Sequence, residues 1–284
     1  MKGIIAVDQE PSVAHAVVGE NAANGVWPPN VTPLPAPATP GVGEVWVDLQ
    51  WYDKPDRPEE PGAVAAIDTS TWQVTRVLPF GNNPHNLGSS PDQRHVYQTS
   101  WHGDQVGVHD RVADRWAKVL NVGSAPAHVA VAPDGAAFVT LNAENYIAEL
   151  DPTTFDVRRH IDFKGLGPHG VWLDRLGSVG VAALTLSSQA AIFDPHSRDV
   201  LAELPASKLP LAASVTSDGK KAYVPGALGG SITVLDVPNR RVSGTIENVG
   251  KILIQVPFTP DDRLAVQAST GNGGAIIVDA SATR

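Results

Sequence analysis

The chain of 284 residues contains no cysteine and a single methionine. Without thiols it can form no disulfide, no thiolate-ligated zinc or iron–sulfur site, and no cysteine nucleophile. It also lacks a run of eighteen apolar residues, so no membrane-spanning helix is expected. The start, MKGIIAVDQE, has too short an apolar stretch for a signal-peptide core, and we predict no signal peptide in this chain.

Clusters of positive charge are missing as well. Lys and Arg number 21 against 30 Asp and Glu, which gives a formal net charge of −9, and no basic run interrupts the sequence. Such a surface repels polyanions, so nucleic acid is excluded as an expected partner. The sequence has no G-x-S-x-G, no Walker loop and no H-E-x-x-H. Whether the protein is an enzyme therefore stays open.

What the sequence does contain is a repeat. Its 26 glycines and 24 prolines favour short strands joined by turns. Aspartates that end apolar runs recur every 41 to 43 residues. They are Asp68, Asp110, Asp151, Asp194, Asp236 and Asp279. Several units also hold a Pro-Asp-Gly-like turn, as at Asp92, Asp134 and Asp218. We expect both sets of aspartates to cap turns.

Four short strands in about 42 residues are typical of a β-propeller blade. We predict an all-β propeller of four-stranded antiparallel blades, forming one domain over residues 1–284. Residues 1–42 would supply irregular outer strands and a proline-rich segment, and residues 43–279 the repeats. Strands from both termini would close the ring. Six blades result if the two ends share a blade, and seven, which we favour, if they do not.

The segments SSPDQRHVYQTS, VAPDGAAFVTLN, TSDGKKAYVPGA and FTPDDRLAVQAS resemble the YVTN repeat of the YncE-like propeller family. The resemblance covers about residues 62–279 and implies a propeller fold and an extracytoplasmic location. The Pro-His strand starts also resemble haem-d1-binding, nitrous-oxide-reductase-type and lactonase-type propellers. In the first two families, histidines lining the channel hold haem or copper. Propellers host unrelated activities, so the resemblance implies no single reaction.

Four histidines are expected on one face of the propeller, which we call the top face. It carries the loops that enter each innermost strand and the loops between the second and third strands. His85, His128 and His169 stand near the starts of innermost strands, and His102 lies in a second-to-third-strand loop. Imidazole binds Cu and Zn, so this set predicts a transition-metal site. The alternative is that these histidines fill the channel mouth and bond to carbonyl groups or water.

Other residues near the same face extend this prediction. Glu144, in the NAENY loop, has the right location for a carboxylate ligand or a catalytic group. Candidate ligand-binding residues are Trp51, Tyr52, Trp101, Asn86 and Asn142. The leading hypothesis is a monomeric propeller that binds a small ligand, cofactor or metal through the top-face histidines.

Two alternatives stay open. One is a lactonase- or lyase-like enzyme in which His85 or His169 acts as acid or base and Glu144 positions the substrate. The other is a non-catalytic scaffold that binds a protein partner at the top face.

Overall fold

The computed structural model describes residues 43–50 and 61–281, and within them the secondary structure is nearly all strand. The chain divides into two compact units, residues 1–129 and 130–284, with the division inside strand β8. The predicted all-β class is confirmed, and among the described residues no helix is long and apolar enough to cross a membrane.

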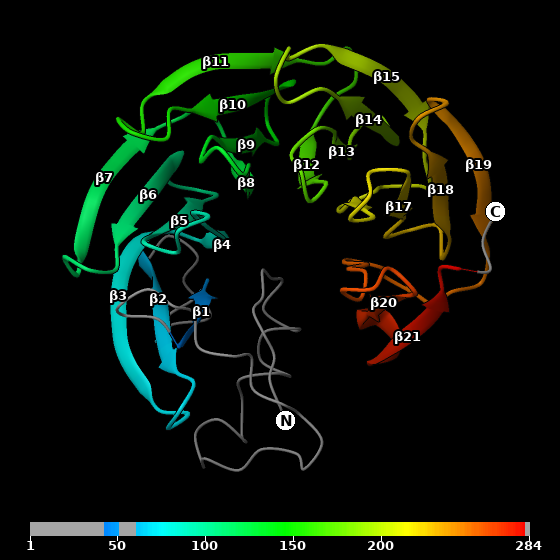
Figure 1. The fold of residues 1–284 in the computed structure, drawn as a ribbon. Helices are drawn as coiled ribbons and strands as arrows, with labels where there is room; N and C mark the ends of the chain where they lie inside the picture. The colour runs from blue at the N-terminus through cyan, green and yellow to red at the C-terminus, as the bar shows by residue number, and fades with distance from the viewer. Residues whose placement is uncertain (1–42, 51–60, 282–284) are drawn as a thin grey trace. The chain divides into compact units, whose positions relative to one another are not determined.

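The first unit contains two antiparallel sheets, each with its strands in chain order (Figure 1). The first sheet has β1 (Glu44–Leu49), β2 (Pro61–Asp68) and β3 (Val74–Asn82). The second has β4 (Pro84–Ser89), β5 (His95–Ser100), β6 (Gln105–Asp110) and β7 (Arg115–Asn121).

The remaining sheets repeat the same pattern of successive antiparallel strands. One has β8 (Pro126–Val131), β9 (Ala137–Leu141), β10 (Tyr146–Leu150) and β11 (Val157–Asp162). The next has β12 (Pro168–Leu173), β13 (Gly180–Leu184), β14 (Gln189–Phe193) and β15 (Val200–Pro205). It is followed by β16 (Ser214–Val215), β17 (Lys221–Pro225), β18 (Ile232–Asp236) and β19 (Arg241–Ile246). The last pairs β20 (Leu264–Ser269) with β21 (Gly274–Asp279), separated by the 3-10 turn Thr270–Asn272.

The described residues thus form six sheets, four of them with the predicted four strands. The expected outer strands and proline-rich segment of residues 1–42 lie outside the described residues. The number of blades, the closure of the ring and the single domain over residues 1–284 therefore stay predictions.

The core of the second unit lies between neighbouring sheets. Phe138 and Ile147 pack with Val171, Leu184 and Phe193 in one buried cluster. The middle strands β9 and β13 are buried on both faces, whereas the outermost β11 is largely exposed. The propeller repeat places its apolar residues on the inner and middle strands because each sheet packs face to face against the next.

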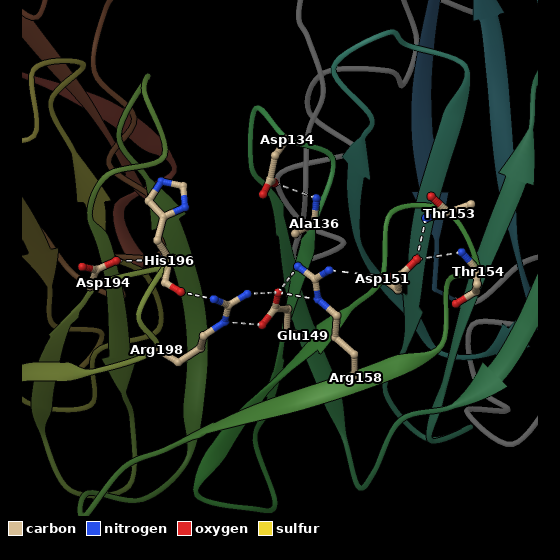
Figure 2. A network of polar contacts seen from close by, with 10 residues as sticks. All are labelled: Asp134, Ala136, Glu149, Asp151, Thr153, Thr154, Arg158, Asp194, His196 and Arg198. Atoms are coloured by element: carbon tan, nitrogen blue, oxygen red, sulfur yellow. Dashed lines mark hydrogen bonds and ion pairs between the residues drawn. The ribbon is translucent and has the colours of Figure 1, made fainter.

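The strand-ending aspartates cap turns, as predicted. Asp110 Oδ1 accepts hydrogen bonds from the backbone N–H groups of Val112 and Ala113, at 2.9 and 3.0 Å. Asp151 accepts equivalent bonds from Thr153 and Thr154, at 2.8 and 2.9 Å (Figure 2). Turn chemistry accounts for this repeated acid, since each side chain satisfies N–H groups that the sheet leaves unpaired.

A buried ion cluster joins two sheets of the second unit. Glu149 on β10 is fully buried, and Figure 2 shows guanidinium groups approaching it from two sides. Arg158 Nε, from β11, donates to Glu149 Oε1 at 2.7 Å, and Arg198 Nε, from the turn before β15, donates to Oε2 at 2.8 Å. Burial alone would raise the pKa of Glu149, but the hydrogen bonds from Arg198 and Arg158 lower it overall. The carboxylate therefore clamps one blade to the next.

Candidate metal centre

Three of the four predicted histidines come together. His85 is the second residue of β4, His128 the third of β8 and His169 the second of β12. All three side chains are buried, with exposed fractions of 6, 5 and 4%. One ring nitrogen from each histidine lies within 4.8 Å of the others. The group consists of imidazoles alone.

Bulges at the strand starts take two of these side chains out of the regular strand pairing. The pairing of β4 with β5 shifts register between Pro84 and Leu87, and that of β12 with β13 shifts between Pro168 and Val171. His85 and His169 lie within these irregular stretches. A bulge turns a side chain out of the regular alternation of a strand, which is why bulges are common beside binding sites.

Threonines of the second strands hold the following strand starts in place. Thr99 Oγ1 on β5 donates to the carbonyl of Ala127, directly before His128, at 2.7 Å. In the second unit Thr140 Oγ1 on β9 donates to the carbonyl of His169 itself. A threonine on the second strand therefore fixes the backbone from which these histidines project.

In the first unit, His85 has a polar and an aromatic neighbour. Its Nδ1 lies 3.0 Å from the side-chain amide of Gln50, which directly follows β1. Its ring lies 4.8 Å from Trp101 and 5.8 Å from His128, measured between centroids. A glutamine amide can present either its oxygen or its nitrogen to a histidine, depending on a rotation of the amide. With the oxygen facing His85, Nδ1 carries the proton and Nε2 keeps its lone pair.

In the second unit, His169 is held in one tautomer. Its Nδ1 lies 2.7 Å from the carbonyl oxygen of Leu211 and must donate, because a carbonyl only accepts. Nε2 then carries the lone pair. Burial lowers the pKa of His169 to about 4, so the ring is neutral at neutral pH. A neutral imidazole whose second nitrogen donates to a carbonyl is the usual form of a metal-ligating histidine.

The other predicted site residues have different surroundings. His102 is exposed in the loop between β5 and β6 and is not a member of the histidine group. Glu144 is half-buried in the loop between β9 and β10 and also lies outside the group. Trp51 and Tyr52 lie outside the described residues.

The two candidate asparagines support the backbone. Asn86 Oδ1 accepts a hydrogen bond from the N–H of Val129 at 2.7 Å, and Asn142 Nδ2 donates to the carbonyl of Gly167 at 3.1 Å. Sequence reasoning missed Gln50, which lies 35 residues before His85 and outside any repeat motif. No signal in the sequence distinguishes this glutamine from a surface residue.

The geometry fits a metal with a modest adjustment. Tetrahedral zinc with nitrogen ligands at about 2.0–2.1 Å places those nitrogens about 3.4 Å apart. Nitrogens that lie within 4.8 Å of one another reach that spacing by side-chain movements on the order of an ångström. Three buried imidazoles could thus hold a metal ion and leave one coordination position for another ligand.

Comparisons with known proteins bear on the fold. No family model and no curated protein matches the chain. Many solved structures do, with 1661 similar chains. One is hydrazine synthase of Kuenenia stuttgartiensis, 17% identical, with a TM-score of 0.50 over 78% of this chain and 90% of that chain. At this identity the likeness shows the fold alone, and together with the successive antiparallel sheets it confirms the β-propeller class.

Proposed function

We propose that this β-propeller binds one transition-metal ion, zinc or copper, through His85, His128 and His169. The observation that carries the proposal is the approach of three buried imidazole nitrogens to within 4.8 Å. Imidazole suits both metals, and a buried site favours the neutral ring that binds them. A chain without cysteine has no thiolate to compete for the ion.

The donor set supports a binding site for a further small ligand. Structural zinc sites are closed by four protein ligands, whereas sites with three protein ligands keep a position for water or substrate. We propose that the ion offers this position to an oxygen of a small molecule. Because Glu144 is not a member of the histidine group, we do not extend the proposal to the lactonase-like reaction. Membership of the YncE-like family is part of the proposal and is supported by the four repeat segments quoted above.

Metal analysis of protein made without a histidine tag tests the proposal. After removal of metal by a chelator and titration with Zn²⁺ or Cu²⁺, we expect one ion per chain by mass spectrometry and a saturable signal by calorimetry. At a free metal concentration of 100 Kd, binding should stabilise the fold by about 2.7 kcal/mol. His128→Ala and His169→Ala should abolish both effects.

His102→Ala is the matched control, because this exposed histidine lies outside the group. It should bind metal as the wild type does. Absence of stoichiometric zinc or copper in the wild type, or equal binding by the His128 and His169 variants, would overturn the proposal.

A change at Gln50 tests how the site is oriented. Gln50→Leu removes the amide beside His85 Nδ1 without removing a ligand. Loss of such an orienting partner weakens metal affinity by about 10–100-fold. Calorimetric titration with Zn²⁺ measures the change, and Gln93→Leu, in a turn between β4 and β5, serves as the control. An affinity equal to the wild type would show that Gln50 does not orient His85.

A further inference from the structure

The second unit contains a cavity that none of the three grouped histidines lines. Its volume is about 460 Å³, within the range of small-molecule sites. It is formed by the ends of β12 and β16 with the turns that follow them, and by the turn before β20. The lining residues are Trp172, Leu173, Arg175, Val215, Ser217, Phe258, Thr259, Pro260 and Asp262.

Trp172 departs from the packing rule of the repeat. It stands on β12 directly opposite Val181 of β13, so the large residue is on the first strand. In two other sheets the corresponding pairs reverse this order, with Gly88 opposite Tyr97 and Ser214 opposite Tyr223. Both tyrosines are buried, whereas Trp172 is 38% exposed. The packing of the blade therefore does not require an indole at this position, and its exposed part faces the cavity.

The turn after β12 departs from the repeat as well. Other sequence repeats have Pro-Asp or Ser-Asp at this position. In this repeat the residues are Arg175 and Leu176. Asp174, one residue earlier, caps the turn instead, accepting the N–H groups of Ser178 and Val179 at 2.6 and 2.8 Å. The turn is thus held without the Arg175 side chain. That side chain is exposed, and no acid among the described residues forms an ion pair with it.

The acidic residue that lines the cavity already accepts hydrogen bonds from another turn. Asp262 accepts the backbone N–H of Ser217 at 3.1 Å on Oδ1 and 2.9 Å on Oδ2, and Ser217 Oγ also donates to Oδ2. The guanidinium of Arg175 is therefore the charged group that the cavity offers to a ligand.

We infer that this cavity binds a small molecule that combines a ring able to stack on an indole with a carboxylate. The indole of Trp172 supplies a face on which a ring stacks, and a guanidinium binds a carboxylate through two parallel hydrogen bonds. Aromatic acids and sugar acids share this chemistry. The inference does not depend on the metal centre, because none of the three histidines lines the cavity.

Calorimetric titration of the full chain with 2-naphthoate and with glucuronate tests the inference and separates the two sources. We expect saturable binding of one acid with a Kd below about 1 mM, and weaker binding of its neutral amide, 2-naphthamide or glucuronamide. Trp172→Ala and Arg175→Gln should each weaken binding at least about tenfold. Leu176→Ala, which changes a 75% exposed residue of the same turn, should bind as the wild type does.

Two further comparisons make the result decisive. Far-ultraviolet circular dichroism and melting curves should match the wild type for both variants, because neither side chain is buried. His169→Ala should keep acid binding while losing metal, so the two sites fail independently. The inference is overturned if neither acid saturates, if the cavity variants bind as tightly as the wild type, or if the neutral amide of the acid that binds is bound as tightly as that acid.

Discussion

Individual histidines in this chain differ in their hydrogen bonds and pKa because their surroundings differ. His169 is held by a carbonyl in one tautomer, in which Nε2 carries the lone pair, whereas His109 on β6 is enclosed by aromatic rings. The rings of Trp46 and Trp116 lie 5.2 and 5.3 Å from that of His109, and Asp114 Oδ1 lies 3.6 Å from its Nε2. Burial lowers the pKa of His109, and the opposing effect of Asp114 does not cancel it. His109 is therefore a neutral core residue.

The folded protein should lose stability on acidification because of His109. A lowered pKa means that the unfolded chain takes up a proton below pH 6.5 while the folded chain does not. The contribution is present above that pH and is lost as the pH falls below it. Urea unfolding between pH 8 and 5, with chelator present, should show a smaller pH dependence for His109→Leu than for the wild type. An unchanged slope would contradict the assignment, whatever the stability of the variant at pH 8.

The repeat spacing relates the grouped histidines to one another, but it does not indicate all their partners. The 84 residues between His85 and His169 are two repeat units, so the two occupy matching strand starts. The predicted set of metal ligands includes His102 because its loop is expected on the same face. Its side chain is exposed. The direction of a loop side chain depends on local backbone angles that a repeat does not encode. Gln50 escaped prediction for a similar reason, since no periodicity links it to His85.

At the scale of strands, the sequence repeat predicts where the strands lie better than it predicts which side chains of different strands are in contact. The apolar run that ends at Asp151 contains β10, yet it gives no sign that Glu149 is fully buried. Its partners Arg158 and Arg198 lie 9 and 49 residues away, and Arg198 belongs to the next sheet. Likewise β16 is reduced to Ser214–Val215, although its repeat position predicts a full strand. Contacts between sheets account for the buried position of Glu149.

The Glu149 clamp should be worth more than a surface ion pair. Arg198→Ala leaves the buried carboxylate with one guanidinium and should cost about 2–3 kcal/mol of unfolding free energy. Arg241→Ala breaks the exposed pair with Asp236 and should cost about 0–1 kcal/mol. Urea denaturation at pH 7 measures both. Equal losses for the two variants would show that the clamp contributes no more than a surface pair.

At the scale of the whole molecule, the fold carries little information about activity. The repeat predicts the propeller because turn chemistry and strand period agree in most of its repeats, and 1661 solved chains are similar. The candidate sites arise where single units depart from the repeat, as at the histidine strand starts and at Trp172 and Arg175. Because propellers host unrelated activities, the departures from the repeat are the features that bear on function.

The same repetition predicts how the molecule responds to acid. Seven turn aspartates have their pKa lowered chiefly by hydrogen bonds from neighbouring turn groups. They are Asp68, Asp92, Asp110, Asp151, Asp218, Asp236 and Asp261. For Asp218 the pKa falls to about 2, mainly through the hydrogen bond from Lys220. Each contribution is present above pH 3.8, the ordinary value, and is lost as the pH falls through the lowered pKa.

Unfolding free energy should therefore fall steeply with pH below about 4, in a window separate from that of His109. Urea denaturation at pH 5, 4 and 3 measures the slope. The double variant Asp92→Asn, Asp151→Asn keeps an oxygen acceptor in each turn but cannot take up a proton there. It should be nearly as stable as the wild type at pH 5 and show a smaller slope below pH 4. A slope equal to that of the wild type would mean that the aspartate turns do not govern the acid stability of the protein, because only the titrating oxygen has been removed.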